Sequence, residues 1–209
     1  ETVVFPFASV GEVPQDLKFR GEKVRLEIGA RNRIREYVTM NPGTEGGGGV
    51  TRIGNDGLFM AGSHVAHDCQ IGSHVTIANT VNLAGHVEIV DWATLGGYTG
   101  VHQFCKIGAH VMTGISSVVV QDIPTYVTAS GQSARPFGIN SEGLKRRGFS
   151  ADDIAIIKRA YRILYRSDRP FADARAEIRA LASGGSDAER RCLAPLADFL
   201  DQVTRGVVR

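Results

Sequence analysis

The chain has few of the features that mark specialised classes of protein. It contains 3 cysteines in 209 residues, and its formal net charge is only +2. An odd and small number of cysteines argues against a disulfide framework, and we interpret them as reduced core residues. No apolar run approaches the roughly 18 residues of a membrane-spanning helix, and no signal peptide opens the chain. We therefore expect a cytoplasmic protein without an integral membrane segment. The small net charge argues neither for nor against nucleic acid, which is not among the partners we expect.

One apolar residue in every six is the dominant pattern of the sequence. The column reads Ile53, Phe59, Val65, Ile71, Ile77, Leu83, Ile89, Leu95, Val101, Ile107, Thr113 and Val119. Thr113 is its one polar member. A period of six is neither the 2 of a strand nor the 3.6 of a helix, and it is typical of hexapeptide repeats.

A second column lies four residues after the first and contains only small or β-branched side chains. Its members are Gly57, Ser63, Cys69, Val75, Val81, Val87, Ala93, Thr99, Cys105, Val111 and Ser117. Such side chains suit a narrow interior. Three hexads then form one triangular coil of 18 residues, and the coils stack as parallel strands about 4.8 Å apart. The sequence therefore predicts a parallel β-helix.

Glycines after several of the first-column residues predict tight corners between strands. They are Gly54, Gly72, Gly96, Gly108 and Gly114. The coil geometry also bears on the cysteines. Cys69 and Cys105 lie two coils apart, about 9.6 Å, which is too far for a disulfide.

The repeat divides the chain into two expected domains, a β-helix over residues 1–137 and a helical domain over 138–209. Within the first we expect loop excursions at 11–27 and 42–52, where proline, glycine and charge interrupt the pattern. The second excursion contains four consecutive glycines. Because no helix start follows them, we interpret them as a flexible surface loop rather than a phosphate cradle.

The helical domain is expected from capping pairs and apolar stripes. Ser150 with Asp153, and Ser186 with Glu189, are typical of helix N-termini. The stripes that follow are Ile154, Ile157, Tyr161, Leu164 and Tyr165; Phe171, Ala174, Ile178 and Leu181; and Leu193, Leu196, Leu200 and Val203.

A cluster of polar residues appears when the 18-residue step is applied to the repeat. His67 falls beneath Gly85, which falls beneath Gln103, and Asp68 falls beneath His86. With His102 beside Gln103, these residues form one patch on one face of the predicted β-helix. A neighbouring His–Asp pair beside a glycine is typical of a catalytic site, so we interpret the patch as functional. A second column, His74, Trp92 and His110, has the same spacing, but an aromatic ladder is more often packing or a subunit contact than a site.

Several motifs resemble the acyl carrier protein dependent UDP-N-acetylglucosamine O-acyltransferases, which begin lipid A biosynthesis. They are QDLK (15–18), GARNRIRE (29–36), HVAHDC (64–69), LAGHV (83–87), VHQFCKIGAHVM (101–112) and FGINSEGLKRRGFS (137–150). The resemblance covers nearly the whole chain. Since members of that family begin with further coils, we expect an N-terminally shortened version.

This resemblance implies a left-handed parallel β-helix in a homotrimer with active sites between subunits. It implies transfer of a 3-hydroxyacyl group from acyl carrier protein to the 3-hydroxyl of UDP-N-acetylglucosamine, with no cofactor and no metal. His67 matches the general base, Asp68 its orienting partner, and Gly85 the residue whose backbone N–H faces the thioester oxyanion.

The remaining matches of the resemblance concern substrate contacts. They are Asp16, Lys18 and His64 for the sugar and phosphate; His86, His102 and Gln103 for the pocket; and Asn140, Glu142 and Arg146 for the nucleotide. Ile115 occupies the position that resembles the family's acyl-length ruler, so we expect a donor of medium length. Arg31, Arg33 and Arg35 could meet an acidic carrier protein.

Three alternative functions remain open at the level of sequence. A hexapeptide enzyme of the carbonic anhydrase type would bind zinc through His64, His67 and His86. The N-acyltransferase of the same pathway shares the repeat and a histidine base, although GLKRRGF (143–149) favours the O-acyl enzyme. A purely structural β-helix would need a regular exposed threonine or aromatic array.

Overall fold

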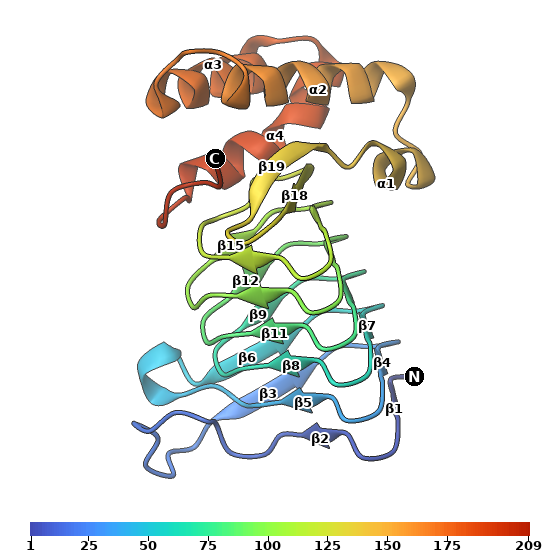
Figure 1. Ribbon diagram of the computed structural model, residues 1–209, viewed down its shortest axis with the longest axis vertical. Helices are drawn as coiled ribbons and strands as arrows, with labels where there is room; N and C mark the ends of the chain where they lie inside the picture. The colour runs from blue at the N-terminus through green and yellow to red at the C-terminus, as the bar shows by residue number, and fades with distance from the viewer.

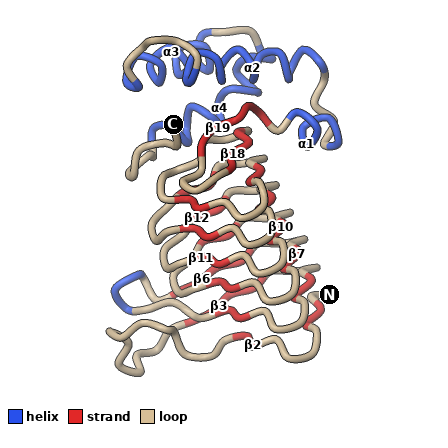
Figure 2. Tube along the Cα trace, viewed as in Figure 1, coloured by secondary structure: helices blue, strands red, loops and turns tan.

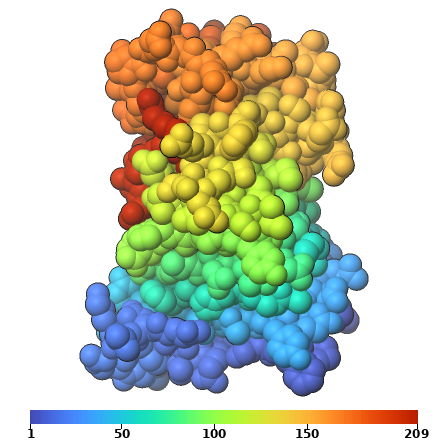
Figure 3. Space-filling view, viewed as in Figure 1, coloured from blue at the N-terminus to red at the C-terminus, as the bar shows by residue number.

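The computed structural model describes residues 1–209 as a three-sided column of stacked coils with helices across one end (Figure 1). Short strands alternate with turns along the column (Figure 2). The N-terminal residues form one end of the molecule and the helical residues the other (Figure 3).

Three sheets form the sides of the column, and almost all of their strand pairs are parallel. The first sheet contains β1 (Val3–Val4), β4 (Arg33–Ile34), β7 (Leu58–Phe59), β10 (Thr76–Ile77), β13 (Thr94–Leu95), β16 (Met112–Thr113), β18 (Val127–Ser130) and β19 (Arg135–Ile139). The second contains β2 (Ser9–Val10), β5 (Thr39–Met40), β8 (His64–Val65), β11 (Asn82–Leu83), β14 (Gly100–Val101) and β17 (Val118–Val119). The third contains β3 (Arg25–Ile28), β6 (Val50–Ile53), β9 (Gln70–Ile71), β12 (Glu88–Ile89) and β15 (Lys106–Ile107).

The strand register confirms the predicted coil of 18 residues. Thr76 of β10 lies beside Leu58 below and Thr94 above. Every residue of the six-residue column is buried, and so is the second column. Thr113 is satisfied in this apolar interior because its hydroxyl lies 2.9 Å from Thr99 Oγ1 and accepts from the Gly96 N–H. The repeat therefore builds one continuous core.

The corners between the sheets differ from what the glycine pattern predicts. The backbone turns through positive φ three residues after the column residues from Ile53 to Thr113, and all of these corner positions except Gly62 are non-glycine, such as His74, Trp92 and His110. None of the column-following glycines has positive φ. They are required for a different reason: a Cβ on Gly54 would lie 2.6 Å from the Gly72 carbonyl carbon of the next coil. Close stacking of coils, rather than turn geometry, selects glycine there.

Both loop excursions leave the column at the same corner, between the second and third sheets. One joins β2 to β3 and the other joins β5 to β6. The predicted limits of 27 and 52 were wrong, because β3 and β6 pair along four residues, Arg25–Ile28 with Val50–Ile53, before the corner is reached. The excursions therefore end at residues 24 and 49. The second contains the 3-10 helix η1 (Glu45–Gly47).

The helical region contains α1 (Ser141–Arg146), α2 (Ala151–Tyr165), α3 (Phe171–Gly184) and α4 (Asp187–Asp201). Both predicted capping boxes are present, at Ser150 with Asp153 and Ser186 with Glu189. β19 extends to Ile139, so the helical structure begins after Asn140, the N-cap of α1, and not at 138. None of these helices combines the length and the apolar character needed to cross a membrane. Cys69, Cys105 and Cys192 are buried and unpaired.

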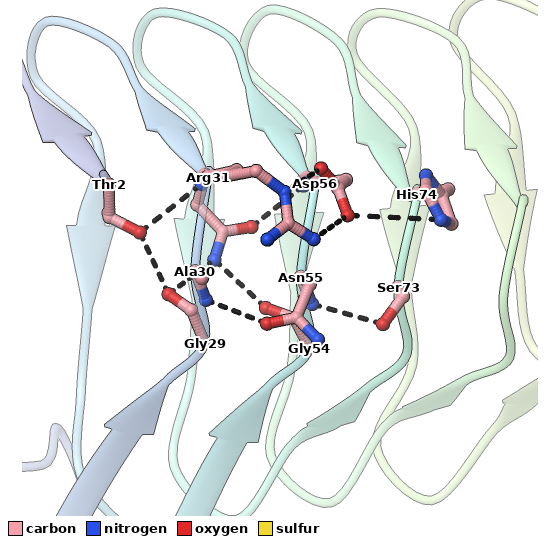
Figure 4. Close-up of polar contacts among 11 residues, drawn as sticks. Thr2, Gly29, Ala30, Arg31, Gly54, Asn55, Asp56, Ser73 and His74 are labelled. Carbon is pink, nitrogen blue, oxygen red and sulfur yellow. Dashed lines mark hydrogen bonds and ion pairs between the residues drawn. The ribbon is translucent and has the colours of Figure 1, made fainter.

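The His74, Trp92 and His110 column is a stacked ladder, which we call the Trp92 corner. His74 stacks on Trp92 with ring centroids 3.9 Å apart, and Trp92 stacks on His110 at 6.3 Å. Arg147 lies over the Trp92 ring and contacts His110 Nδ1 at 3.2 Å. Below the ladder, Asp56 pairs with Arg31 and faces His74 (Figure 4). The chain thus covers this column only in part, because Trp92 remains 36% exposed and the His74 side chain 38%.

Candidate functional site

The turn after β8 carries His67 and Asp68, at the corner from which the two excursions leave one and two coils below. We call it the His67 corner. Asp68 adopts a positive φ of 60°, the turn conformation found once in each hexad. His86 and Phe104 occupy the same position in the next two coils, and their rings stack at 4.4 Å. The repeat thus sets these side chains above one another, as the sequence predicts.

His67 and Asp68 form a hydrogen-bonded pair. His67 Nδ1 lies 2.8 Å from Asp68 Oδ2, and the Asp68 side chain is fully buried. A carboxylate accepts from Nδ1–H, which leaves Nε2 of the neutral ring without a proton. The imidazole is only partly buried, with 17% of its side chain exposed. Its free nitrogen can therefore receive a proton from a bound molecule.

Thr44 and Thr51, which the sequence analysis missed, hold Asp68 in place. Thr44 donates to the two carboxylate oxygens from its backbone N–H at 2.8 Å and its hydroxyl at 2.7 Å. Thr51 Oγ1 accepts from the Asp68 N–H at 2.8 Å. Thr51 lies 17 residues before Asp68, and the 18-residue step places it beneath Cys69, the next residue along the chain. Nothing in the sequence indicates that Thr44, which lies in an excursion, reaches this carboxylate.

The glycine-rich second excursion packs against the same carboxylate. A Cβ on Gly47 would lie 2.0 Å from Asp68 Cγ, and one on Gly43 would lie 2.7 Å from Asp68 Oδ1. Gly43 and Gly47 thus let the excursion close over Asp68, because a side chain at either position would displace the carboxylate. A Cβ on Gly46, Gly48 or Gly49 would meet no other atom.

Gly85 lies directly over the His67 ring. A Cβ on Gly85 would lie 2.5 Å from His67 Cε1 and 2.7 Å from Nε2. The Gly85 N–H has no acceptor within the chain. A substrate oxygen at Nε2 would therefore meet an open backbone donor and no obstructing side chain.

His86 completes the polar cluster at this corner. Its ring meets His67 edge to face at 5.1 Å, and its Nε2 lies 3.8 Å from Asp68 Oδ2. Burial lowers the pKa of His86, against the opposing effects of the Asp68 and Asp16 carboxylates. His86 is thus neutral at neutral pH and adds no positive charge beside His67.

The predicted contacts Asp16 and Lys18 lie in the first excursion, where the Asp16 carboxylate accepts from the Lys18 N–H at 3.0 Å. This excursion leaves the column at the His67 corner, between β2 and β3. His64 projects from β8 and bonds Thr39 Oγ1 through Nδ1 at 2.6 Å. Burial, and secondarily His67, lowers the pKa of His64.

Two hollows border the His67 corner. On the second sheet, a shallow and mainly apolar groove is lined by His64, Ala84, Gly100, His102, Val118 and Val120. On the third sheet, a hollow of about 520 Å³ is lined by Gly47, Arg52, Asp68, Gln70, His86 and Lys106. Gln103 is exposed, and its carbonyl lies 3.1 Å from His102 Nδ1. One side of the corner thus offers apolar surface and the other charged groups.

The nucleotide-contact candidates do not join this cluster within one chain. Asn140 is the N-cap of α1, and its Nδ2 donates to the His110 carbonyl at the Trp92 corner. Glu142 pairs with Lys145, and Arg146 is exposed on the same helix. Ile115 lies at the third corner, before β17, with 70% of its surface exposed. Of the arginines considered for a carrier protein, Arg31 and Arg35 are paired with Asp56 and Glu36.

The residues that could bind a metal ion in the structure are not the three histidines of the zinc alternative. The ligand atoms of His67, Asp68 and His86 lie within 4.8 Å of one another, and His64 is not part of this set. Its Nδ1 is bonded to Thr39 instead. Asp68 is already engaged by three donors, from Thr44 and His67. The three-histidine arrangement expected for a carbonic anhydrase type site is therefore not formed.

Comparisons with known proteins agree on one family. Residues 122–208 match the model described as UDP N-acetylglucosamine O-acyltransferase, domain 2. The chain is 54% identical over 206 residues to the acyl-acyl-carrier-protein UDP-N-acetylglucosamine O-acyltransferase of Thiobacillus denitrificans, covering 99% of this chain and 78% of the relative. The enzyme of the same name from Herminiimonas arsenicoxydans is 51% identical, with coverage of 100% and 79%.

Solved structures give the same result for the fold. The UDP-N-acetylglucosamine O-acyltransferase of Moraxella catarrhalis superposes with a TM-score of 0.94 at 42% identity, covering 100% of this chain and 79% of that one. The Arabidopsis acyltransferase superposes at 0.89 with 32% identity, covering 100% and 74%. The expected fold, a left-handed parallel β-helix followed by a small helical region, is confirmed.

Proposed function

Because this chain belongs to the acyl carrier protein dependent UDP-N-acetylglucosamine O-acyltransferases of lipid A biosynthesis, we propose that His67 is the general base of its acyl transfer. The acceptor is the 3-hydroxyl of UDP-N-acetylglucosamine, and the donor is a 3-hydroxyacyl thioester of acyl carrier protein. The observation that carries the proposal is the 2.8 Å contact from His67 Nδ1 to Asp68, which leaves Nε2 as a base beneath Gly85.

The reaction needs one proton acceptor and one oxyanion donor. His67 Nε2 takes the proton of the sugar hydroxyl as its oxygen attacks the thioester carbonyl carbon. Negative charge develops on the carbonyl oxygen, and the free N–H of Gly85 is oriented to stabilise it. When the intermediate collapses, the C–S bond breaks, the ester forms, and the imidazolium returns its proton to the leaving thiolate. Asp68 stabilises the imidazolium in between, and no covalent enzyme intermediate or cofactor is required.

The two hollows at the corner support a division of the substrates. We assign the charged hollow on the third sheet, with Asp16 and Lys18 from the first excursion, to the sugar nucleotide. Lys106 and Arg52 line this hollow, where they are paired with Glu88 and Glu27 and would have to exchange these partners for the diphosphate. The apolar groove on the second sheet suits the acyl tail, and the turn of Ile115 borders the same sheet at its opposite corner.

A homotrimer would reunite residues that one chain keeps apart. Asn140, Glu142 and Arg146 belong to α1 near the Trp92 corner, whereas His67 lies at another corner of the triangle. A neighbouring subunit that presents its α1 to the His67 corner would complete the nucleotide site. The enzyme is assigned to the cytoplasm, where acyl carrier protein and sugar nucleotides are available.

The direct test of this function is an acyl-transfer assay with purified protein. UDP-N-acetylglucosamine is incubated with a series of 3-hydroxyacyl carrier proteins, and the product is identified by mass and by the position of its ester. We expect one O-acylated product. Absence of product with every donor would overturn the proposal. A zinc mechanism at His67, Asp68 and His86 is tested with a chelator and by elemental analysis. Full activity after chelation, with less than one metal ion per chain, would exclude that mechanism and leave the proposed one.

A further inference from the structure

A third hollow lies far from the His67 corner, where the β-helix meets the helical region. Its volume is about 290 Å³, and its polar lining comes from Arg135 of β19, Tyr161 and Tyr165 of α2, Arg166 and Arg209. β19 closes the first sheet beyond β18, whereas β7, in the coil of His67, lies three strands below β16. None of these residues takes part in the proposed acyl transfer.

Two tyrosine hydroxyls in this hollow lack a hydrogen-bond acceptor. Tyr161 and Tyr165 lie side by side with ring centroids 4.9 Å apart, and neither buried hydroxyl donates to another group of the chain. Only 8% of Tyr161 is exposed. Burial raises the pKa of both phenols, so both remain protonated hydrogen-bond donors. Buried polar groups are normally satisfied, and two orphans in one hollow point to a missing acceptor.

The arginines of the hollow are also unpaired. Arg135, Arg166 and Arg209 make no ion pair, whereas Arg159, Arg179 and Arg191 of the same helical region are each paired with a carboxylate. Arg166 is close enough to influence the pKa of Tyr161, and Arg209 that of Tyr165. Three exposed arginines thus line the hollow together with the two tyrosines, and no carboxylate side chain lines it.

We propose that this hollow binds the phosphate group of a small phosphorylated molecule, at a site separate from the catalytic one. Guanidinium groups bind phosphate oxygens in bidentate fashion, and phenolic O–H groups complete the set of donors. Because the lining comes from β19, α2 and Arg209, the ligand would tie the helical region to the end of the β-helix. Its binding should therefore stabilise the folded chain.

The test is thermal unfolding of the protein with inorganic pyrophosphate as the probe. Saturating UDP-N-acetylglucosamine is present throughout to occupy the catalytic site, and sodium chloride of equal ionic strength is the reference. At about ten times the dissociation constant, we expect Tm to rise by roughly 3 °C above the reference. No rise above sodium chloride would overturn the proposal.

Variants locate the effect. Tyr161→Phe removes a hydroxyl that has no acceptor in the chain, so the variant should stay close to the wild-type Tm without pyrophosphate, yet it should show a smaller rise with it. Arg166→Gln should lose most of the rise. The matched control is Arg162→Gln, an exposed arginine of the same helix that does not line the hollow. Equal rises in Arg166→Gln and Arg162→Gln would mean that pyrophosphate binds elsewhere, and the assignment would be wrong.

Discussion

Asp68 Oδ2 accepts hydrogen bonds from both His67 Nδ1, at 2.8 Å, and Thr44 Oγ1, at 2.7 Å. The carboxylate therefore links the predicted base to an excursion that begins a full coil below it. Its orientation depends on the second excursion as well as on the repeat. That excursion thus has a mechanistic role, because Thr44 fixes the carboxylate that orients the imidazole.

This link predicts the effect of removing the Thr44 hydroxyl. Thr44→Val keeps the shape of the side chain but leaves one oxygen of Asp68 with one donor fewer, so the imidazole is held less firmly. We expect kcat to fall by about 10- to 100-fold, the range typical of residues that orient a functional side chain, with little change in KM. Thr76→Val, on the outer face of β10, is the control and should retain wild-type kcat. Equal kcat values for the two variants would show that Thr44 does not position Asp68.

The exposed Ile115 predicts the preferred length of the acyl donor. A branched side chain at this turn should shorten the groove, so that donors of about ten to twelve carbons are used in preference to about fourteen. Excluding four methylenes costs about 3 kcal/mol, or roughly 10² in kcat/KM. Ile115→Gly should shift the preference toward the longer donor, as measured by kcat/KM for each length. An unchanged preference would leave Ile115 as a packing residue only.

The lowered pKa of His110 predicts that the free energy of unfolding falls in mild acid. Burial, reinforced by Arg147 and opposed by Asp91, lowers the pKa of His110 from its ordinary 6.5 to about 4. Between these values the unfolded chain binds a proton that the folded chain does not. The stability that the folded chain gains from keeping His110 neutral is therefore complete above pH 6.5, and it is lost as the pH falls toward 4.

Because His110 is partly exposed, its contribution is at most about 2 kcal/mol. His110→Phe keeps the stacking with Trp92 and Tyr126 but removes the titrating group. Urea unfolding at several pH values should show a shallower decline of the free energy of unfolding in this variant. Parallel declines in the two proteins would exclude His110 as the cause.

A homotrimer is predicted, because a single chain leaves a row of apolar side chains exposed to solvent. Phe7, Tyr37, Tyr98 and Ile115 share the third corner and are 62% to 75% exposed. Such a row is typical of an interface. Light scattering should therefore give three times the chain mass of 22.5 kDa. A single-chain mass at micromolar concentration would rule out the homotrimer.

The hexad period was sufficient to predict the β-helix, because one buried position in six and a step of 18 determine which residues stack. The same step brought His67, Asp68, Gly85 and His86 together correctly. It could not predict that the positive-φ corner residues would be His, Trp and Phe rather than glycine. Glycine would adopt this backbone conformation more readily. The residues that occupy these corners instead stack their rings between neighbouring coils.

The hexad repeat could not predict which residues of the excursions contact Asp68, for a related reason. Thr44 and Gly47 have no fixed register with Asp68, since the excursion interrupts the hexads, and the path of a loop is not periodic. The column of His74, Trp92 and His110 was expected to be packing or a subunit contact. Its partner Arg147 comes from after α1, and no spacing rule connects a helix end to a coil corner.

The central claim, that His67 is the general base, is tested most directly by the turnover of His67→Ala beside His74→Ala. His74 is a histidine on another corner of the same β-helix and takes no part in the proposed reaction. With circular dichroism and assembly state unchanged in both variants, kcat for acyl transfer should fall by about 10² to 10⁴ in His67→Ala and stay near wild type in His74→Ala. Wild-type turnover in His67→Ala would contradict the account.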